Sequence, residues 1–227
     1  KRFKNLHMAI PYVRGIEFEY GEVQQVSPLI RRVIANNPGP FTYVGTGVYI
    51  IGHGEVAVID PGPMDETHFA ALRKALEGET VTHVLVTHGH SDHSPLAAPM
   101  AEWAGCKTYA KNCGVPTAKG ELGSADDLGF MPDVKVGDGD SFSGPGWTTT
   151  VVAPPDGDMA DYMDSLEKIR VMGFETLWPT HGNPVRGKDF VNTFITEYAS
   201  HRRAREASIL EHLRRGETSI PAMVEIM

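Results

Sequence analysis

The alternation of strand-like and helix-like segments is the feature that most restricts the fold of this chain. Residues 55–59 and 81–86 are short runs rich in Val, Ile and Leu, which are typical of buried strands. A polar loop follows each run, and apolar residues at helical spacing follow the loop, as at Phe69, Leu72 and Leu76 after the first run. Strands that alternate with helices predict an α/β fold in which helices cover the faces of a sheet.

Capping residues mark the starts of two of these helices. Asp65 is expected to cap the helix that carries the first apolar pattern. Ser94 and Pro95 are expected as the N-cap and the first position of the next helix. The apolar face of that second helix is expected to consist of Leu96, Met100 and Trp103.

The remaining segments extend the pattern to the end of the chain. Further strands are expected at residues 41–51, 107–110, 134–136, 147–152 and 176–178. Further helices are expected at residues 159–169, 185–216 and 219–227, with residues 112–129 as a loop that holds a short helix. Phe190, Phe194 and Tyr198 are expected on one face of the long helix. With 227 residues, the chain is expected to form a large domain at residues 1–185 and an appendage at residues 186–227.

Composition excludes several classes of protein. Hydrophobic residues make up 41% of the chain and charged residues 22%, which is typical of a globular protein rather than a disordered or fibrous one. No stretch approaches the roughly 18 apolar residues of a membrane span, so a cytoplasmic protein is expected. Cys106 and Cys113 form no disulfide framework and do not match zinc spacing. The net charge of −8 argues against non-specific binding to nucleic acid or membrane.

A histidine cluster carries the functional signal. His88, His90, Asp92 and His93 follow the strand-like run at 81–86, and His181 follows a later predicted strand. Imidazole nitrogens and a carboxylate are the ligand types that zinc and its first-row neighbours prefer. In an extended loop, His88 and His90 point the same way, while a turn lets Asp92 and His93 face a second ion. Two adjacent ions that share a water favour hydrolytic chemistry.

Each of these residues also has a plainer interpretation. The cluster could be a set of solvated loop histidines, and a lone Thr-His-Gly sequence around His181 is often only a turn. Asp60, which follows the strand at 55–59, could simply cap a proline-glycine turn. The alternative role for Asp60 is to orient the imidazole of a metal ligand.

At these residues the sequence resembles the metallo-β-lactamase superfamily. The resemblance is carried by Val-Ile-Asp-Pro-Gly at 58–62, Thr-His-Gly-His-Ser-Asp-His at 87–93 and Pro-Thr-His-Gly at 179–182. It implies an αββα sandwich of two mixed sheets covered by helices, with a metal site at one sheet edge. It also implies two divalent ions, zinc by default, without fixing whether both positions are filled.

The resemblance implies a role for each residue of the cluster. The implied ligands are His88 and His90 for the first ion, and Asp92, His93 and His181 for the second. Asp92 is also implied as a catalytic proton acceptor, and Asp60 as the aspartate behind a ligand imidazole.

Two further segments resemble the group of this superfamily that contains β-lactamase-like protein 2. These are residues 37–42, ahead of the first strands, and residues 201–206 in the long helix. In that group a small winged-helix-like C-terminal domain follows the hydrolase domain. Residues 209–227 resemble its opening, so this appendage is expected to be incomplete.

The sequence also departs from the superfamily pattern. A third histidine ligand and a bridging aspartate are expected between the first cluster and His181, and neither is visible. Asp138 and Asp140 lie on a predicted turn and are not expected to take the bridging role. A segment of several tens of residues is therefore predicted to be missing between residues 144 and 152.

Three functions remain open at this point. The favoured one is a hydrolase in which a metal-bound hydroxide attacks an ester, thioester, lactone or amide bond of a small molecule. The second is a metal-dependent endoribonuclease, motivated by the basic run at 201–205 with Arg214 and Arg215. The third is a non-catalytic homologue with an incomplete metal site.

The acidic composition makes RNA the less favoured partner, and no membrane partner is expected. A homo-oligomer stays open. Arg202, Arg203 and Arg205 are expected to serve structure rather than RNA, with Arg202 paired to Glu206 four residues along the helix.

Overall fold

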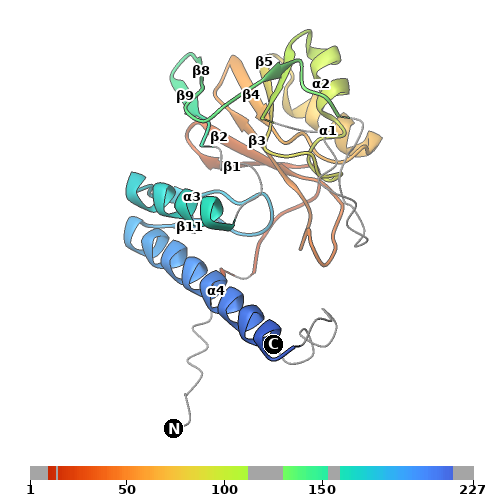
Figure 1. Ribbon diagram of the computed structural model, residues 1–227. Helices are drawn as coiled ribbons and strands as arrows, with labels where there is room; N and C mark the ends of the chain where they lie inside the picture. The colour runs from red at the N-terminus through yellow and green to blue at the C-terminus, as the bar shows by residue number, and fades with distance from the viewer. Residues whose placement is uncertain (1–9, 14, 112–129, 153–158, 217–227) are drawn as a thin grey trace. The chain divides into compact units, whose positions relative to one another are not determined.

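A computed structural model describes residues 10–13, 15–111, 130–152 and 159–216 of the chain (Figure 1). Among these residues, no helix is both long enough and apolar enough to cross a membrane.

The chain divides into two compact units. The first, which we call the sheet unit, comprises Arg14–Ala153 and Pro179–Asn183. The second, the helical unit, comprises Lys1–Val13, Pro154–Trp178 and Pro184–Met227. The domain boundary expected from the sequence, between residues 185 and 186, stays a prediction.

The sheet unit is built on one seven-stranded mixed sheet. Its strands are β1 (Val23–Ser27), β2 (Ile30–Ile34), β3 (Gly47–Ile51), β4 (Glu55–Ile59), β5 (Thr80–Val86), β6 (Lys107–Ala110) and β7 (Val134–Lys135), and they lie in sequence order across the sheet. The pairs from β1 to β4 are antiparallel, and the pairs from β4 to β7 are parallel. Parallel neighbours require a crossover connection. The helices α1 (Glu66–Ala75) and α2 (Ala97–Ala104) provide two of these crossovers, which confirms the predicted α/β class.

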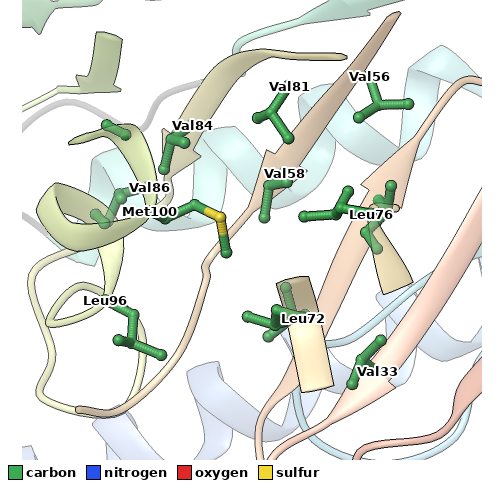
Figure 2. Close-up of a cluster of buried hydrophobic side chains, with 14 of the residues drawn as sticks. Val33, Val56, Val58, Leu72, Leu76, Val81, Val84, Val86, Leu96 and Met100 are labelled. Carbon is green, nitrogen blue, oxygen red and sulfur yellow. The ribbon is translucent and has the colours of Figure 1, made fainter. Parts of the chain in front are cut away.

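The core of the sheet unit lies where these two helices pack on β4 and β5. Figure 2 shows Leu72 of α1, Leu76 at the C-cap of α1 and Met100 of α2 in one cluster with valines such as Val58 and Val84. Residues 56–58 of β4 are all buried, so both faces of this strand are covered. The strand that leads into Asp60 is therefore held by packing on both of its faces.

A separate hairpin packs over the start of β4. Strand β8 (Ser141–Gly144) pairs with β9 (Trp147–Thr150) through a two-residue turn, and Gly144 lies opposite Trp147. The indole Nε1 of Trp147 donates to the Glu55 carbonyl at 2.9 Å. A Cβ on Gly144 would lie 2.5 Å from the Trp147 ring, so only glycine fits there. The segment predicted to be missing falls at this hairpin, where the structure runs directly from β8 to β9, and its absence relative to the family stays a prediction.

The helical unit consists of two helices and a short ribbon. Its elements are α3 (Met159–Met172), β10 (Thr176–Leu177), β11 (Val185–Arg186) and α4 (Lys188–Arg214). The face of α4 predicted from the sequence is correct in part: Phe194 packs against the buried cluster of the helical unit and stacks on Tyr198, but Phe190 does not join them. Val191, Ile195 and Ala199 are buried, whereas Phe190 is 38% exposed, because the four-residue spacing that packs on α3 begins at Val191.

The arginine pairing predicted on α4 also differs. The sequence predicted Glu206 as the partner of Arg202. In the structure the guanidinium of Arg202 donates to the Tyr198 hydroxyl at 2.9 Å and lies over the Tyr162 ring at 5.6 Å. The aromatic surface between α3 and α4 therefore takes up this cation.

The strands β1 and β2 were not predicted, because their sequence reads as polar. Both arginines of β2 are nevertheless buried. Arg31 forms an ion pair with Glu79 at 2.8 Å. Arg32 donates to Gln24 at 2.9 Å and to the Gly182 carbonyl at 3.0 Å. Distant partners supplied by the fold satisfy these charges, which periodicity alone does not reveal.

The start of α2 differs from the prediction. Leu96, rather than Ser94, occupies the N-cap position. The Ser94 hydroxyl instead donates to the His90 carbonyl at 3.1 Å. The side chain expected to cap α2 therefore bonds within the histidine loop. Trp103 is 43% exposed and does not join the buried face of Leu96 and Met100.

The strand predicted over residues 41–51 is shorter in the structure. It begins only at Gly47, because the Tyr43 N–H donates to the Gly39 carbonyl at 2.8 Å in a tight turn. The elements predicted within residues 112–129 and 219–227 lie outside the described residues.

Candidate metal centre

The candidate site lies where β4 and β5 end. Asp60 directly follows β4, and Thr87 directly follows β5, its parallel neighbour. Carboxyl ends of parallel strands form one edge of a sheet, where loops carry functional groups. Asp60 has a positive φ of 49°, an uncommon backbone conformation that asparagine and aspartate tolerate best. Its carboxylate accepts from the N–H and from the hydroxyl of Thr87, both at 2.7 Å, so it links the two strand ends.

Asp60 also fixes His93. Both side chains are almost fully buried, and the carboxylate Oδ2 of Asp60 accepts from Nδ1 of His93 at 2.9 Å. Because a carboxylate only accepts, Nδ1 carries a proton, and Nε2 is the nitrogen whose lone pair can bind an ion. That lone pair faces Oδ2 of Asp92 at 3.1 Å. The plain interpretation of Asp60 as a turn cap therefore omits its contact with an imidazole of the cluster.

His181 reaches the same carboxylate from a distant part of the sequence. Its Nδ1 lies 3.3 Å from the Gly45 carbonyl, which requires Nδ1 to carry the proton. Its Nε2 lies 3.1 Å from Oδ2 of Asp92. The turn that holds His181 is anchored on β3, because the Gly47 N–H donates to the Thr180 carbonyl at 2.7 Å and the Tyr49 hydroxyl to the Pro179 carbonyl at 2.6 Å.

Three acceptor atoms therefore converge at one point. Oδ2 of Asp92 and the two Nε2 atoms of His93 and His181 lie within 4.8 Å of one another. At Nε2–Oδ2 distances of 3.1 Å, either a proton on the ring or a cation between the atoms offsets the repulsion of these lone pairs. One carboxylate and two neutral imidazoles form a donor set that fits a divalent first-row metal. By chemistry and by spacing, the residues present fit such an ion.

His88 and His90 form a second, smaller group. Nε2 of His88 lies 2.9 Å from Nδ1 of His90, and Nδ1 of His88 lies 2.9 Å from the Thr87 hydroxyl. Burial, followed by the nearby charges of His93 and His90, lowers the pKa of His88 to about 4. His88 is therefore neutral at physiological pH, as a metal ligand must be.

The two groups differ in completeness. Within the described parts of the chain, the group of three metal-ligating side chains comprises Asp92, His93 and His181, and no third such side chain completes a group with His88 and His90. Catalytic zinc typically has three protein ligands. All six residues singled out from the sequence nevertheless lie together in the sheet unit.

Two threonines at the site were missed in the sequence. Thr87 bonds Asp60 and contacts His88, and Thr46 is fully buried and donates to Oδ2 of Asp92 at 3.1 Å. The position of Thr87 at the end of a predicted strand, beside His88, was an available signal. Thr46 lies 46 residues from Asp92, so nothing local in the sequence marked it.

Comparison with known proteins gives relatives along most of the chain. A protein of Caenorhabditis elegans named beta-lactamase-like protein 2 homolog is 26% identical over 228 residues, covering 86% of this chain and 74% of the relative. A shorter match, 38% identical over 79 residues, is to an atrochrysone carboxyl ACP thioesterase of Claviceps purpurea, and it covers 34% of this chain and 26% of that protein.

A solved structure and a family comparison agree with these relatives. The crystal structure of a beta-lactamase domain protein from Burkholderia ambifaria superposes with a TM-score of 0.66 at 21% identity, covering 84% of this chain and 79% of that one. The sequence model of the metallo-beta-lactamase superfamily matches residues 42–155, about half of the chain. Together with the mixed sheet and its helices and with the loop at 87–93, this match confirms the resemblance found in the sequence: the chain belongs to the metallo-beta-lactamase superfamily.

Proposed function

We propose that this protein is a metal-dependent hydrolase that cleaves an ester, thioester, lactone or amide bond of a small molecule. One observation carries the proposal. Three acceptor atoms, from Asp92, His93 and His181, converge, and the partners of both imidazoles fix their protons on the far side of the rings. Such a preorganised donor set has a clear use in binding a divalent cation.

Zinc is the first choice for two imidazoles and a carboxylate, and manganese and iron also accept these ligands. A bound divalent ion supplies Lewis acidity and lowers the pKa of water, so that a nucleophile is available at neutral pH. His88 and His90 would hold a second ion more weakly, because the described residues give that position only two ligands.

The protein's own groups have distinct tasks in this proposal. Asp60 holds His93 in the required tautomer, and the Gly45 carbonyl does the same for His181. Asp92 is 18% exposed, so its carboxylate is within reach of solvent and can accept a proton. Asp92 is therefore proposed both as a ligand and as the proton acceptor.

The charges of the molecule favour a small substrate over RNA. The net charge is −8, which repels a polyanion. On the basic helix, Arg202 contacts Tyr198 and Tyr162, and Arg215 pairs with Glu211 at 2.9 Å. These arginines already have partners within the helical unit. The thioesterase name of one relative supports a thioester as the first substrate to test.

A second candidate follows from the incomplete His88–His90 group. With two ligands at that position, the protein could bind a single ion without turning over a substrate. Measured turnover decides between this non-catalytic alternative and the hydrolase.

The test combines metal analysis with a substrate panel. We expect zinc-loaded protein to hydrolyse at least one of acyl-CoA thioester, p-nitrophenyl ester, γ-lactone and β-lactam. Cleavage of single-stranded RNA alone would instead favour the endoribonuclease. Asp92→Ala and His181→Ala should abolish that turnover, whereas His53→Ala, an exposed histidine outside the site, should leave it unchanged. Turnover that survives Asp92→Ala would contradict the proposal, and bound metal with no turnover would favour the non-catalytic alternative.

A further inference from the structure

The segment Gly45-Thr46-Gly47 contacts both distant parts of the candidate metal centre. The Thr46 hydroxyl donates to Oδ2 of Asp92 at 3.1 Å. The neighbouring Gly45 carbonyl lies 3.3 Å from Nδ1 of His181, and the Gly47 N–H donates to the Thr180 carbonyl at 2.7 Å. Asp92 and His181 are far apart in the sequence, and these three consecutive residues connect them.

The direction of the Thr46 hydrogen bond is set by Asn37. The Asn37 amide Nδ2 donates to the Thr46 hydroxyl at 2.9 Å, and the Asn37 Oδ1 accepts from the Thr46 N–H at 2.8 Å. An amide NH₂ only donates, so the hydroxyl oxygen must accept there. The hydroxyl proton is therefore left for Asp92, whose carboxylate only accepts. Asn37 thus aims the hydroxyl at the ligand.

The surroundings hold this arrangement in place. Thr46 is fully buried, and its carbonyl accepts from the Ala35 N–H at 2.9 Å. The Thr42 hydroxyl donates to the Asn37 carbonyl at 2.6 Å. Gly45 has a φ of +134°, and a Cβ there would lie 2.2 Å from the Ala35 carbonyl oxygen, so only glycine permits the close approach.

We propose that Asn37 and Thr46 are positioning residues that fix the carboxylate of Asp92 for the ion. The inference rests on the proposed function in one respect, that Asp92 and His181 hold a divalent cation. A free aspartate side chain samples several rotamers. The Thr46 hydroxyl selects the rotamer in which Oδ2 faces both Nε2 atoms. Partners behind metal ligands typically change metal affinity about 10- to 100-fold when they are removed.

The test is the affinity of the purified protein for Co²⁺ and Zn²⁺, measured by competition with a chelator. Thr46→Val keeps the shape of the side chain and removes the hydroxyl, and we expect it to weaken binding of the ion by about 10- to 100-fold. Thr46→Ser keeps the hydroxyl and should bind within about threefold of the parent. The visible spectrum of the Co²⁺ protein should change in Thr46→Val and not in Thr46→Ser.

Two further variants test the same role by other routes. Asn37→Ala leaves the Thr46 hydroxyl in place but removes the group that aims it, so it should weaken binding in the same direction by a smaller factor. In an Asp92→Ala background, Thr46→Val should cause no further loss, because the hydroxyl then has no carboxylate to position.

The outcomes separate the two proposals. If Asp92→Ala and His181→Ala bind Co²⁺ as the parent does, the proposed metal site is wrong and the positioning role falls with it. If those variants lose the ion while folded Thr46→Val and Asn37→Ala keep the parent affinity, only the positioning role is overturned. Equal losses in Thr46→Val and Thr46→Ser would also overturn it, since the hydroxyl would not be the cause.

Discussion

The two halves of the candidate metal centre are built differently. The three-ligand half, Asp92, His93 and His181, has a partner behind each ligand, namely Thr46, Asp60 and the Gly45 carbonyl. The histidine pair, His88 and His90, comes entirely from one loop and lacks a third ligand among the described residues. The comparison teaches that a local motif supplies ligands, whereas the fold must complete the set and orient it.

The third ligand that the histidine pair lacks among the described residues is predicted to lie on a missing stretch of chain. The alignment with the Caenorhabditis elegans relative extends over 228 residues, although it includes only 86% of this 227-residue chain. The relative therefore has tens of residues without a counterpart here. This agrees with the expectation of a missing segment that would carry a third histidine and a bridging aspartate, and that expectation stays a prediction. His181 lies beyond the expected gap, and the half that depends on it has three ligands.

Removing the shared ligand of the three-ligand half should have the largest effect. Asp92→Ala should weaken binding of the tightest divalent ion by more than about 100-fold, because the anionic one of three ligands is lost and two neutral imidazoles remain. Chelator competition measures this affinity. Glu77→Ala, an exposed carboxylate in the same unit, is the matched control and should bind like the parent. If Asp92→Ala keeps the parent affinity, Asp92, His93 and His181 do not form the tighter site, and the contrast with the histidine pair is wrong.

Removing the support behind His93 should come next. Asp60→Asn replaces an acceptor of three hydrogen bonds by an amide whose NH₂ faces donors. Metal affinity should fall about 10- to 100-fold, and the free energy of unfolding should fall by about 1–3 kcal/mol. Isothermal titration and chemical denaturation measure the two effects. Asp140→Asn, on an exposed turn, should change neither metal affinity nor activity. Unchanged affinity in Asp60→Asn would show that Asp60 serves the strand ends alone.

The histidine pair should matter less for the tight ion. His88→Ala combined with His90→Ala should leave about one tightly bound ion per chain, with an affinity within about tenfold of the parent, because the three-ligand half is intact. Metal analysis after dialysis gives the number of ions. Two tightly bound ions per parent chain would contradict the contrast between the halves, and so would loss of the tight ion in the double variant.

The fold class, and the place of the histidine loop after β5, could be read from the sequence, because both rest on short-range patterns. The runs at 55–59 and 81–86 and the cap at Asp65 predicted β4, β5 and α1 within a residue or two. The candidate ligands at 88–93 lie together in the sequence. For these elements, propensity, spacing and burial agree.

The remaining features depend on distant partners that the fold supplies. Arg31 and Arg32 make the sequence of β2 polar, and their partners Glu79 and Gln24 lie elsewhere in the sequence. In the sequence, Thr46 is one residue of the strand predicted at 41–51. Its contact with Asp92 forms only when the fold brings residue 92 next to it. Side chains that act through tertiary contacts leave no periodic signal.

The smallest expected effect concerns a histidine behind the loop of Asp60. His68 is buried and donates from Nε2 to the Pro61 carbonyl at 3.1 Å, next to the residue that holds His93. Burial lowers the pKa of His68, and the Pro61 carbonyl and the charge of Asp65 oppose this shift. The unfolded chain therefore takes up a proton at His68 before the folded chain does as the pH falls.

This shift predicts that His68 makes the folded state less stable below a pH of about 6.5, the ordinary pKa of histidine. In His68→Phe, the decline of the unfolding temperature between neutral pH and pH 5 should be shallower than in the parent, when both are measured without metal. His201→Phe, at an exposed position, should keep the parent slope. A His68→Phe slope equal to that of the parent would show that His68 titrates alike in both states. A shallower slope together with unchanged Co²⁺ affinity would show that His68 affects the stability of the fold. It would also show that His68 does not affect ion binding by Asp92, His93 and His181.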